Sequence, residues 1–468
     1  MYTLKKDTKI TAEIINAVIE YNESIATRFT KLNNIYLGKH DILNREKDGV
    51  LSNNRVVVNH AKYITDTNVG YLLGNPVNYL ATDDINIDAV LKEYKRQTIT
   101  DLDSEIAKSV SIMGLQREYV YANENAEPRS CVIDNRNSVI VYDDTVEHKK
   151  MFGIIYRELV EGDIKESKNK TYEVIVVDKA SITTYHSKGK KVLTKQGKEK
   201  PHTFGDVPII EYRNNPELLG DFEPVISLID AYNLLQSDRI NDKEQLVDAI
   251  LVLYGATLED AQMETLKSQR YASGLPNDSK MEYLIKQLQE SDVDVLRKNV
   301  EADIHKISMT PNMSDQNFVG NSSGVAIRYK LLAFEQNIKN KERYMERGLV
   351  ERLKLYINFL STKSNDITKD IPVEDIDVVF KRNLPSNDLE TSQIINNLVD
   401  LVDSETLLSQ ISFIKDAKEI MEAKVKEDEA KPKPAFDPLL NANEINDANG
   451  QVQSKADNLE EKADKLDT

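Results

Sequence analysis

Hydrophobic residues recur at helical spacing in several long segments of the chain. Residues 9–36 carry apolar or aromatic side chains three or four positions apart, which predicts a first helix. A second helix is expected over 101–113 and should stop at Gly114. The longest helical pattern runs from 324 to 361, and its apolar stripe slips once, near Lys341. The longest predicted helix therefore lies in the second half of the chain.

Between residues 117 and 213 the period of the pattern falls to two. Short β-branched and aromatic runs such as SVIVYD and YEVIVVD alternate with polar turns, which predicts a sheet-rich region of antiparallel type. Residues 187–200 are basic and contain glycine, and we expect them to form one of its hairpins. A returning strand is expected over 376–385.

The segment from 222 to 254 has the start and stop signals of one helix. Acidic residues precede Pro224 at its beginning, and Gly255 follows its end. Both ends are apolar, whereas residues 236–245 are polar apart from Ile240. Because an ordinary packed helix keeps one apolar stripe throughout, this helix is expected to pass between different surroundings.

A short insert separates this helix from another. Thr257 and Asp260 fit a capping box for a helix to about Tyr271, and the run MEYLIKQ suits a strand. Helical spacing then resumes over 291–309. The insert is therefore predicted to sit between two helices that run back to back.

Further helices are expected over 386–400 and 404–428. From Lys431 the chain is rich in Pro, Asn, Asp and Ala with isolated apolar residues, so 431–468 is expected to be a disordered acidic tail.

A loop of turn-forming residues, NFVGNSSG (317–324), precedes the longest helix. Its Asn, Gly and Ser residues favour left-handed or locally hydrogen-bonded backbone rather than regular structure. It could cradle an anion at the helix N-terminus, or it could simply cap the helix, with Ser322 or Ser323 as the N-cap.

Charge restricts the function further. The chain of 468 residues is 40% hydrophobic and 30% charged, with a formal net charge of −17. Proteins that grip phosphate show a basic footprint, so tight binding of DNA over the whole surface is disfavoured. A protein that DNA slides past is compatible with this charge, because a negative wall repels the DNA backbone.

The cysteine content and the lack of long apolar segments indicate the cellular compartment in which the chain folds. Cys131 is the single cysteine, which excludes an intrachain disulfide and a cysteine-based zinc site, and it is expected to be buried and unreactive. The first ten residues have no apolar core of a secretory signal, and no window approaches the ~18 apolar residues of a membrane span. We expect folding in a reducing cytoplasm.

The sequence offers no active site. The six histidines are scattered, and neither a phosphate-binding loop nor a nucleophile elbow occurs. Asp143 and Asp144, with His148 nearby, could be metal ligands of a nuclease, although a solvated turn explains them more simply. We therefore expect no catalytic residue, metal or cofactor.

The order of the predicted parts, together with three local stretches, suggests a family. The stretches are YITDTNVGYLLGNPVNY, GDVPIIEYRNNPELLGDFEPVISLIDAYNLLQSD and MSDQNFVGNSSGVAIRYKLL. Over residues 1–425 the chain resembles the portal proteins of tailed bacteriophages, in the branch common in phages of Gram-positive bacteria. Another ring-forming virion component, such as a neck adaptor or tail protein, is the alternative. Those proteins are usually much shorter, and the insert between two helices would be unexplained.

The resemblance implies an α+β portal fold assembled as a ring, with a wing of helices plus antiparallel sheet, a two-helix stem, a small α/β clip, a long helix and a helical crown. The implied parts are the wing (1–220), a stem helix (221–254), the clip (255–290), a second stem helix (291–309), a tunnel loop (310–323), a long wing helix (324–363), a wing strand (364–385), the crown (386–430) and the tail (431–468).

The resemblance also implies a role and partners. Portal proteins of this family form a ring of twelve identical subunits at one capsid vertex, and double-stranded DNA passes through the ring during packaging and ejection without sequence-specific contacts. The implied partners are the large terminase subunit, the major capsid and scaffolding proteins, and later the neck or tail adaptor. The implied location is the virion, after assembly in the host cytoplasm, with no membrane and no enzymatic activity.

Candidate site residues follow from the same resemblance. The tunnel-loop residues that would face DNA are Asn312, Met313, Ser314, Asp315, Asn317, Phe318, Val319, Gly320, Asn321, Ser322, Ser323 and Gly324. The candidates for lining the channel in the stem are Asp238, Asp242, Glu244, Asp292 and Asp294. The candidates for the clip interface are Glu259, Asp260, Lys267, Arg270, Tyr271 and Tyr283.

Overall fold

The computed structural model divides into two units, Met1–Leu384 and Pro385–Thr468, which are described separately. The described residues are 2–46, 52–81, 85–159, 171–188, 193–247, 250–255, 257, 259–260, 263–264, 278–284, 290–313, 327, 329–363, 371–382, 393, 395–399, 404–409, 420–421 and 423–424. The mixture of helices and sheets confirms the predicted α+β class.

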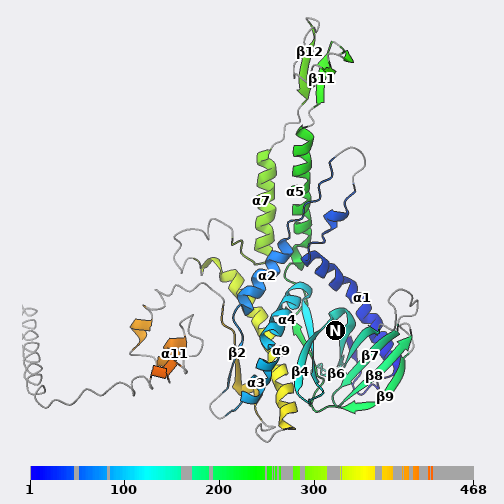
Figure 1. Ribbon diagram of the computed structural model, residues 1–468, viewed down its shortest axis with the longest axis vertical. Coiled ribbons are helices and arrows are strands. Elements are labelled where there is room, and N and C mark those ends of the chain that lie inside the picture. The colour runs from blue at the N-terminus through cyan, green and yellow to red at the C-terminus, as the bar shows by residue number, and fades with distance from the viewer. Residues whose placement is uncertain are drawn as a thin grey trace, which may run out of the picture. The chain divides into compact units, whose positions relative to one another are not determined.

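Most strands of the first unit belong to two sheets (Figure 1). The six-stranded sheet has the order β1-β5-β6-β7-β8-β9, and the three-stranded sheet has the order β10-β3-β4. Their strands are β1 (Tyr2–Leu4), β3 (Leu115–Ala122), β4 (Pro128–Ile133), β5 (Ser138–Asp143), β6 (Lys150–Leu159), β7 (Thr171–Asp178), β8 (Ser181–Lys188), β9 (Leu193–Pro201) and β10 (Ile209–Arg213). The predicted antiparallel region is confirmed, including the hairpin of β8 and β9. The parallel pairing of β1 with β5 was not predicted.

The described helices of the first unit include two that the sequence did not predict, α2 and α3. They are α1 (Ala12–Tyr36), α2 (His60–Leu73), α3 (Asp88–Arg96), α4 (Ile99–Met113), α5 (Ile226–Val247), α7 (Glu290–Ile307) and α9 (Leu332–Ser361), with 3-10 turns η1 (Asp41–Asn44), η2 (Asn135–Asn137), η3 (Glu223–Val225) and η4 (Val373–Asp375). As predicted, α4 stops at Gly114, whose φ of 83° favours glycine. A Cβ there would also lie 2.0 Å from the carbonyl oxygen of Leu218.

The prediction of one helix over 222–254 is wrong at its C-terminal end. Helix α5 stops at Val247, and β11 (Ile250–Tyr254) pairs antiparallel with β12 (Lys280–Leu284). A short apolar run such as ILVLY fits a helix and a strand equally well, and here its backbone is satisfied by a partner distant in sequence. The strand expected in MEYLIKQ is confirmed as β12.

Two other sequence expectations are confirmed in part. The long helix is observed as α9, although residues 324–326 lie outside the described residues. The returning strand is β13 (Ile376–Val379), which pairs antiparallel with β2 (Asn78–Ala81). In the second unit the structure describes α11 (Ser404–Ser409), whereas much of the predicted terminal helices and the whole tail from 431 lie outside the described residues.

The first unit packs in layers, as the alternation of its strands requires. Along β5, Val139 and Val141 face helix α1, whereas Ile140 and Tyr142 pack toward Ile209 of the three-stranded sheet. The far side of that smaller sheet is covered by α9, whose long buried face completes the largest core. The order is therefore α1, six-stranded sheet, three-stranded sheet and α9.

Helix α9 approaches the smaller sheet closely because of Gly348. A Cβ at this position would lie 2.3 Å from the Tyr212 ring. One turn further on, the fully buried Arg352 donates to Glu118 Oε1 at 2.8 Å and to Asp103 Oδ1 at 2.6 Å. Burial raises the pKa of Asp103, and the Arg352 guanidinium opposes this rise. A charged cluster therefore joins α9 to α4 and β3 inside the core.

Buried phenols make the fold sensitive to alkali. Burial raises the pKa of Tyr119 and of Tyr356 to about 12. A raised folded-state pKa contributes stability that is complete below the ordinary value of about 10 and is lost as pH rises toward the folded value. We predict cooperative unfolding between about pH 10 and 12, seen as coincident changes in circular dichroism and tyrosinate absorbance. The absence of tryptophan keeps that absorbance signal clean.

The controls for this alkaline transition are single Tyr→Phe variants. Tyr119→Phe removes one raised phenol and should move the transition to higher pH, whereas Tyr329→Phe, at a position 75% exposed, should leave it in place. Complete formation of tyrosinate without a change in circular dichroism would contradict the prediction.

Candidate functional site

A two-helix stalk projects from the body of the first unit. Helices α5 and α7 lie side by side, and the β11–β12 ribbon lies beyond their far ends (Figure 1). The chain enters the stalk just after Asp221 and returns to the body at Thr310, and both residues are buried. The stalk thus begins and ends at one base.

Lys341 of α9 holds this base together. Its Nζ donates to Asn68 Oδ1 at 2.6 Å and also to Asp221 Oδ2. Asn68 of α2 in turn donates to Thr310 Oγ1 at 2.9 Å, and Ser111 of α4 donates to Asp221. We call these five residues the Lys341 hub. It connects three body helices to both ends of the stalk.

The hub contains a buried ion pair, between Lys341 and Asp221. The side chains of Lys341 and Asp221 are 8% and 3% exposed. Burial lowers the pKa of Lys341, and the Asp221 carboxylate opposes this shift. Asp221 also accepts from Asn214 Nδ2 at 2.7 Å, so its charge is bonded on several sides. Removing either partner would leave an uncompensated charge in the interior.

Aromatic rings close the base next to the hub. His60 of α2 meets Tyr232 of α5 edge to face, with ring centroids 4.8 Å apart, and lies 5.8 Å from the ring of His305 on α7. Burial, together with His305, lowers the pKa of His60 to about 4, so His60 is neutral at neutral pH. The rings therefore fill the junction of the three helices, with His60 as an uncharged member.

The chain that leaves α7 is fixed at its start. The Tyr63 hydroxyl donates to the Pro311 carbonyl at 3.0 Å and accepts from the Met313 amide at 2.9 Å. Asn312 Nδ2 donates to Glu301 Oε1 at 3.1 Å. Of the tunnel-loop candidates, only Asn312 and Met313 are described, and the other ten, from Ser314 to Gly324, lie outside the described residues. The predicted loop therefore starts from an anchored position.

The polar middle of α5 supports an extended segment of the chain. The backbone amides of residues 54, 56 and 58 donate to side chains on successive turns of α5, at 2.7, 3.0 and 2.8 Å. The acceptors are Asn241, Ser237 and Asn233 in that order, and all three are buried. Every second residue of an extended segment advances about 6.6 Å, and every fourth residue of a helix advances about 6 Å. The spacing of the amides at 54, 56 and 58 therefore matches the spacing of their acceptors on α5. This ladder explains the polar middle of the helix within a single chain.

Among the predicted channel-lining carboxylates of the stalk, Asp238, Glu244 and Asp294 have partners in the same chain. Asp238 pairs with Arg45 at 2.7 Å, and Glu244 accepts from Asn54 Nδ2 at 2.6 Å.

On α7, Asp294 pairs with Lys298 at 2.8 Å and with Arg297 at 3.1 Å, and hydrogen bonds from these two cations lower its pKa. Asp292 is exposed and Asp242 is partly buried. Whether these groups face a channel remains a prediction.

The clip candidates are only partly described. Glu259 and Asp260 are exposed, and Tyr283 lies on β12 opposite Leu251 of β11. Lys267, Arg270 and Tyr271 lie outside the described residues.

The acidic pair considered for metal binding forms a turn instead. Asp143 Oδ1 accepts from the Thr145 hydroxyl at 2.6 Å and from the Lys149 amide at 3.0 Å. Asp144 accepts from the Lys6 amide at 3.0 Å, which fastens the N-terminal strand.

Cys131 is partly buried rather than buried, and burial raises its pKa to about 11. Within the described part of the chain, no cluster of three or more His, Cys, Asp or Glu could hold a metal.

No helix in the described ranges has the length and apolar character needed to cross a membrane.

Comparison with known proteins identifies the family. Residues 15–433 match the family described as phage portal protein, SPP1 Gp6-like. The chain belongs to this family. It is similar to the portal protein of Bacillus phage SPP1, with 23% identity over 403 residues, 80% of this chain and 76% of that relative. It is also similar to the portal protein of Clostridium phage phiCD119, with 20% identity over 439 residues, 87% of this chain and 94% of that relative.

The predicted resemblance to portal proteins is therefore confirmed. Because portal proteins are structural components of the virion, the chain is a bacteriophage head–tail connector protein rather than a member of an enzyme family. The sequence reading missed the Lys341 hub and the ladder on α5. The slip near Lys341 and the polar stretch 236–245 were the signals that pointed to them.

A double-mutant cycle tests the hub. Lys341→Met strands the Asp221 carboxylate in the interior and should lower the free energy of unfolding by ~3–5 kcal/mol. In an Asp221→Asn background the same change should cost ~1–3 kcal/mol less, because no buried charge is left unpaired. Urea unfolding followed by circular dichroism measures both.

The matched control is Lys92→Met on the exposed side of α3, with an expected change within ~0.5 kcal/mol. Equal losses for Lys341→Met in the two backgrounds would show that the ion pair does not hold the base.

Proposed function

We propose that twelve copies of this chain form a ring at one capsid vertex, through which double-stranded DNA passes during packaging and ejection. The proposal rests on one observation in a chain of the portal family. A two-helix stalk leaves the body and returns to it at a single base, where hydrogen bonds join its two ends. The loop from α7 to α9 starts at that base, so a ring of stalks around an axis would bring twelve loops to the same level.

Exposed apolar residues on the stalk support assembly through it. Leu234 of α5 is 43% exposed, and Val295 and Leu296 of α7 are 58% and 49% exposed. A two-helix stalk is too narrow to bury apolar side chains with such large exposed fractions within its own chain. Contacts with neighbouring stalks would bury them. Because α5 and α7 would meet different neighbours, such contacts suit a closed ring.

The parts of the proposed portal follow the chain. The wing would be 1–220 with 364–385 and the long helix 324–363, the stem 221–247 and 291–309, the clip 250–290, the tunnel loop 310–323, the crown 386–430 and the acidic tail 431–468. Since α5 ends at Val247, β11 would belong to the clip rather than to the stem.

The composition of the tunnel loop suits a sliding contact. Between residues 312 and 324 Asp315 is the only charged residue, and the others are small, polar or apolar. Such groups can touch DNA without the release of counterions that makes basic proteins bind it tightly. DNA would therefore pass without sequence-specific contacts, and no catalytic step or cofactor is part of the proposal.

The proposed partners are assigned to the parts by position. The clip would meet the large terminase subunit during packaging and the neck or tail adaptor afterwards, with Glu259, Asp260 and Tyr283 among its contacts. The wing would meet the major capsid and scaffolding proteins. Assembly would take place in the host cytoplasm.

End-on electron microscopy of the purified protein tests the ring. We expect a broad ring that narrows at one end and has an axial hole. A stable monomer at micromolar concentration, with residues 314–324 protected from hydrogen exchange, would overturn the proposal.

Two glycine variants test the loop separately. Gly320→Pro and Gly324→Pro should leave ring assembly intact but reduce DNA packaging, because proline removes the backbone freedom that a loop needs to follow a screw-symmetric duplex. Gly320→Ala and Gly324→Ala are the matched controls and should package more DNA than the proline variants. Packaging at the unmodified level by both proline variants would contradict the role of the loop.

A further inference from the structure

One face of α9 carries a row of exposed cations. Lys339, Arg343, Arg347 and Lys354 are all exposed and lie within an arc of about 80°, over about 22 Å of the helix. We call these four residues the α9 cationic stripe. Among the described residues none of them makes a hydrogen bond or ion pair, although Arg347 lies over the Tyr344 ring, 5.1 Å from its centroid.

Three of the four acidic residues of α9 pair with groups outside the stripe, and the fourth, the partly buried Glu346, lies on the helix beside it. Glu335 and Glu342 pair with Arg382, and Glu351 pairs with Lys150. Unpaired cations on one face are unexpected in a chain with a net charge of −17, where carboxylates outnumber basic groups. The stripe therefore lacks a partner within the described part of its own chain.

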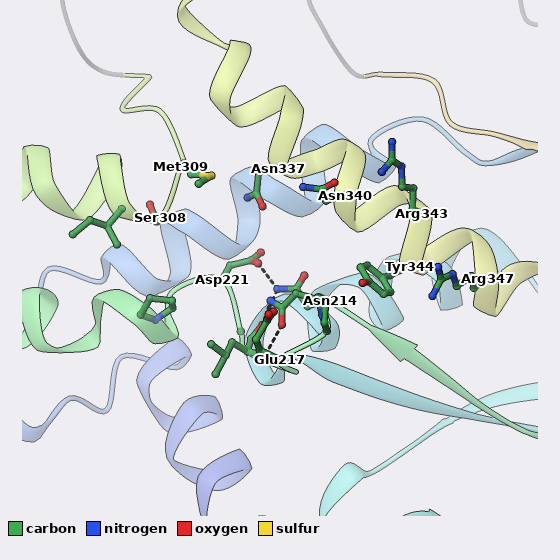
Figure 2. Close-up of a pocket in the computed structure, with 16 residues that line it drawn as sticks. Asn214, Glu217, Asp221, Ser308, Met309, Asn337, Asn340, Arg343, Tyr344 and Arg347 are labelled. Atoms are coloured by element: carbon green, nitrogen blue, oxygen red, sulfur yellow. Dashed lines mark hydrogen bonds between the residues drawn. The ribbon is translucent and has the colours of Figure 1, made fainter. Parts of the chain in front are cut away.

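A pocket of about 530 Å³ opens beside the stripe (Figure 2). Arg343 and Arg347 line it from α9, and Ile307 and Met309, each 51% exposed, line it from the end of α7. Asn340 adds an amide between the cations and the apolar side. The pocket thus offers guanidinium groups next to exposed apolar side chains.

The pocket shares one lining residue, Asp221, with the Lys341 hub, and buried bonds hold that residue in place. Asp221 lines it and is bonded to Lys341 and to Asn214, as Figure 2 shows for the second of these bonds. The carboxylate of Asp221 already pairs with Lys341, so it does not neutralise Arg343 and Arg347. Glu217 is the other acid in the lining, so the two arginines still leave the rim with a net positive charge.

The mixture of groups favours a protein as the occupant. Phosphate groups of a nucleic acid would use the arginines but would gain nothing from Ile307 and Met309. A protein segment with carboxylates and apolar side chains uses both, because arginine binds carboxylate through two parallel hydrogen bonds. A second copy of this acidic chain is such a partner, and in a closed ring each copy presents two different faces to its neighbours.

We propose that the α9 cationic stripe and its pocket receive a carboxylate-bearing segment of the neighbouring copy in the ring. This inference rests on the proposed ring and adds the partner of this particular surface. The pairing neutralises cations that the monomer leaves open, so assembly becomes sensitive to salt.

A double charge reversal tests the proposal. Arg343→Glu with Arg347→Glu should raise the protein concentration for half-maximal ring formation at least tenfold at about 0.1 M salt, measured by mass photometry. Arg343→Gln with Arg347→Gln should raise it less. The matched control, Lys198→Glu with Lys200→Glu on the exposed strand β9, changes the net charge equally and should assemble like the unmodified protein.

Mixing the reversed variant with unmodified protein tests whether each copy uses two different faces in the ring. The reversed variant keeps its other face, so added to unmodified protein it should end growing arcs and reduce the yield of closed rings. Circular dichroism of each variant verifies the fold.

The outcomes separate the two proposals. Failure of the unmodified protein to form rings would overturn the proposed function itself. Rings of the reversed variant at the unmodified concentration would overturn the inference alone. Normal rings of this variant that no longer retain DNA would assign the surface to nucleic acid and overturn it as well.

Discussion

The stalk depends on one buried ion pair, between Lys341 and Asp221. A lysine in the interior is unfavourable unless an anion compensates it, and the anion comes from the residue at which the chain enters the stalk. Through Asn68 the same lysine also reaches Thr310, where the chain returns. The longest helix and the two ends of the stalk therefore share one electrostatic constraint, and the pocket beside α9 is built on it.

The arrangement of elements was largely predictable, because it depends on local patterns. The helical stripe of 9–36, the glycine stop at 114 and the alternation in β5 and β7 were sufficient for the α+β class. The prediction failed where a partner distant in sequence decided the structure. The run 250–254 became a strand because β12 is available to pair with it, and β1, from the beginning of the chain, joined the sheet beside β5.

The candidate site was predictable only in outline. The polar stretch of α5 predicts a change of surroundings, whereas in the structure its Asn241 and Ser237 bind the backbone amides of residues 54 and 56. Asp238 and Glu244 were chosen for their charge, and each has a partner from the segment before α2. Sequence spacing shows that polar groups share a helix face, whereas the groups that they meet depend on the tertiary fold.

The closed base has a consequence for how such proteins diversify. Since the chain departs at Asp221 and comes back at Thr310, both held by the same lysine network, the stalk begins and ends at one place on the body. The far end of the stalk can be lengthened, shortened or exchanged without disturbing the layered body. Under the proposed function, in which partners dock at that end, a virus lineage could exchange those partners while inheriting the layered body.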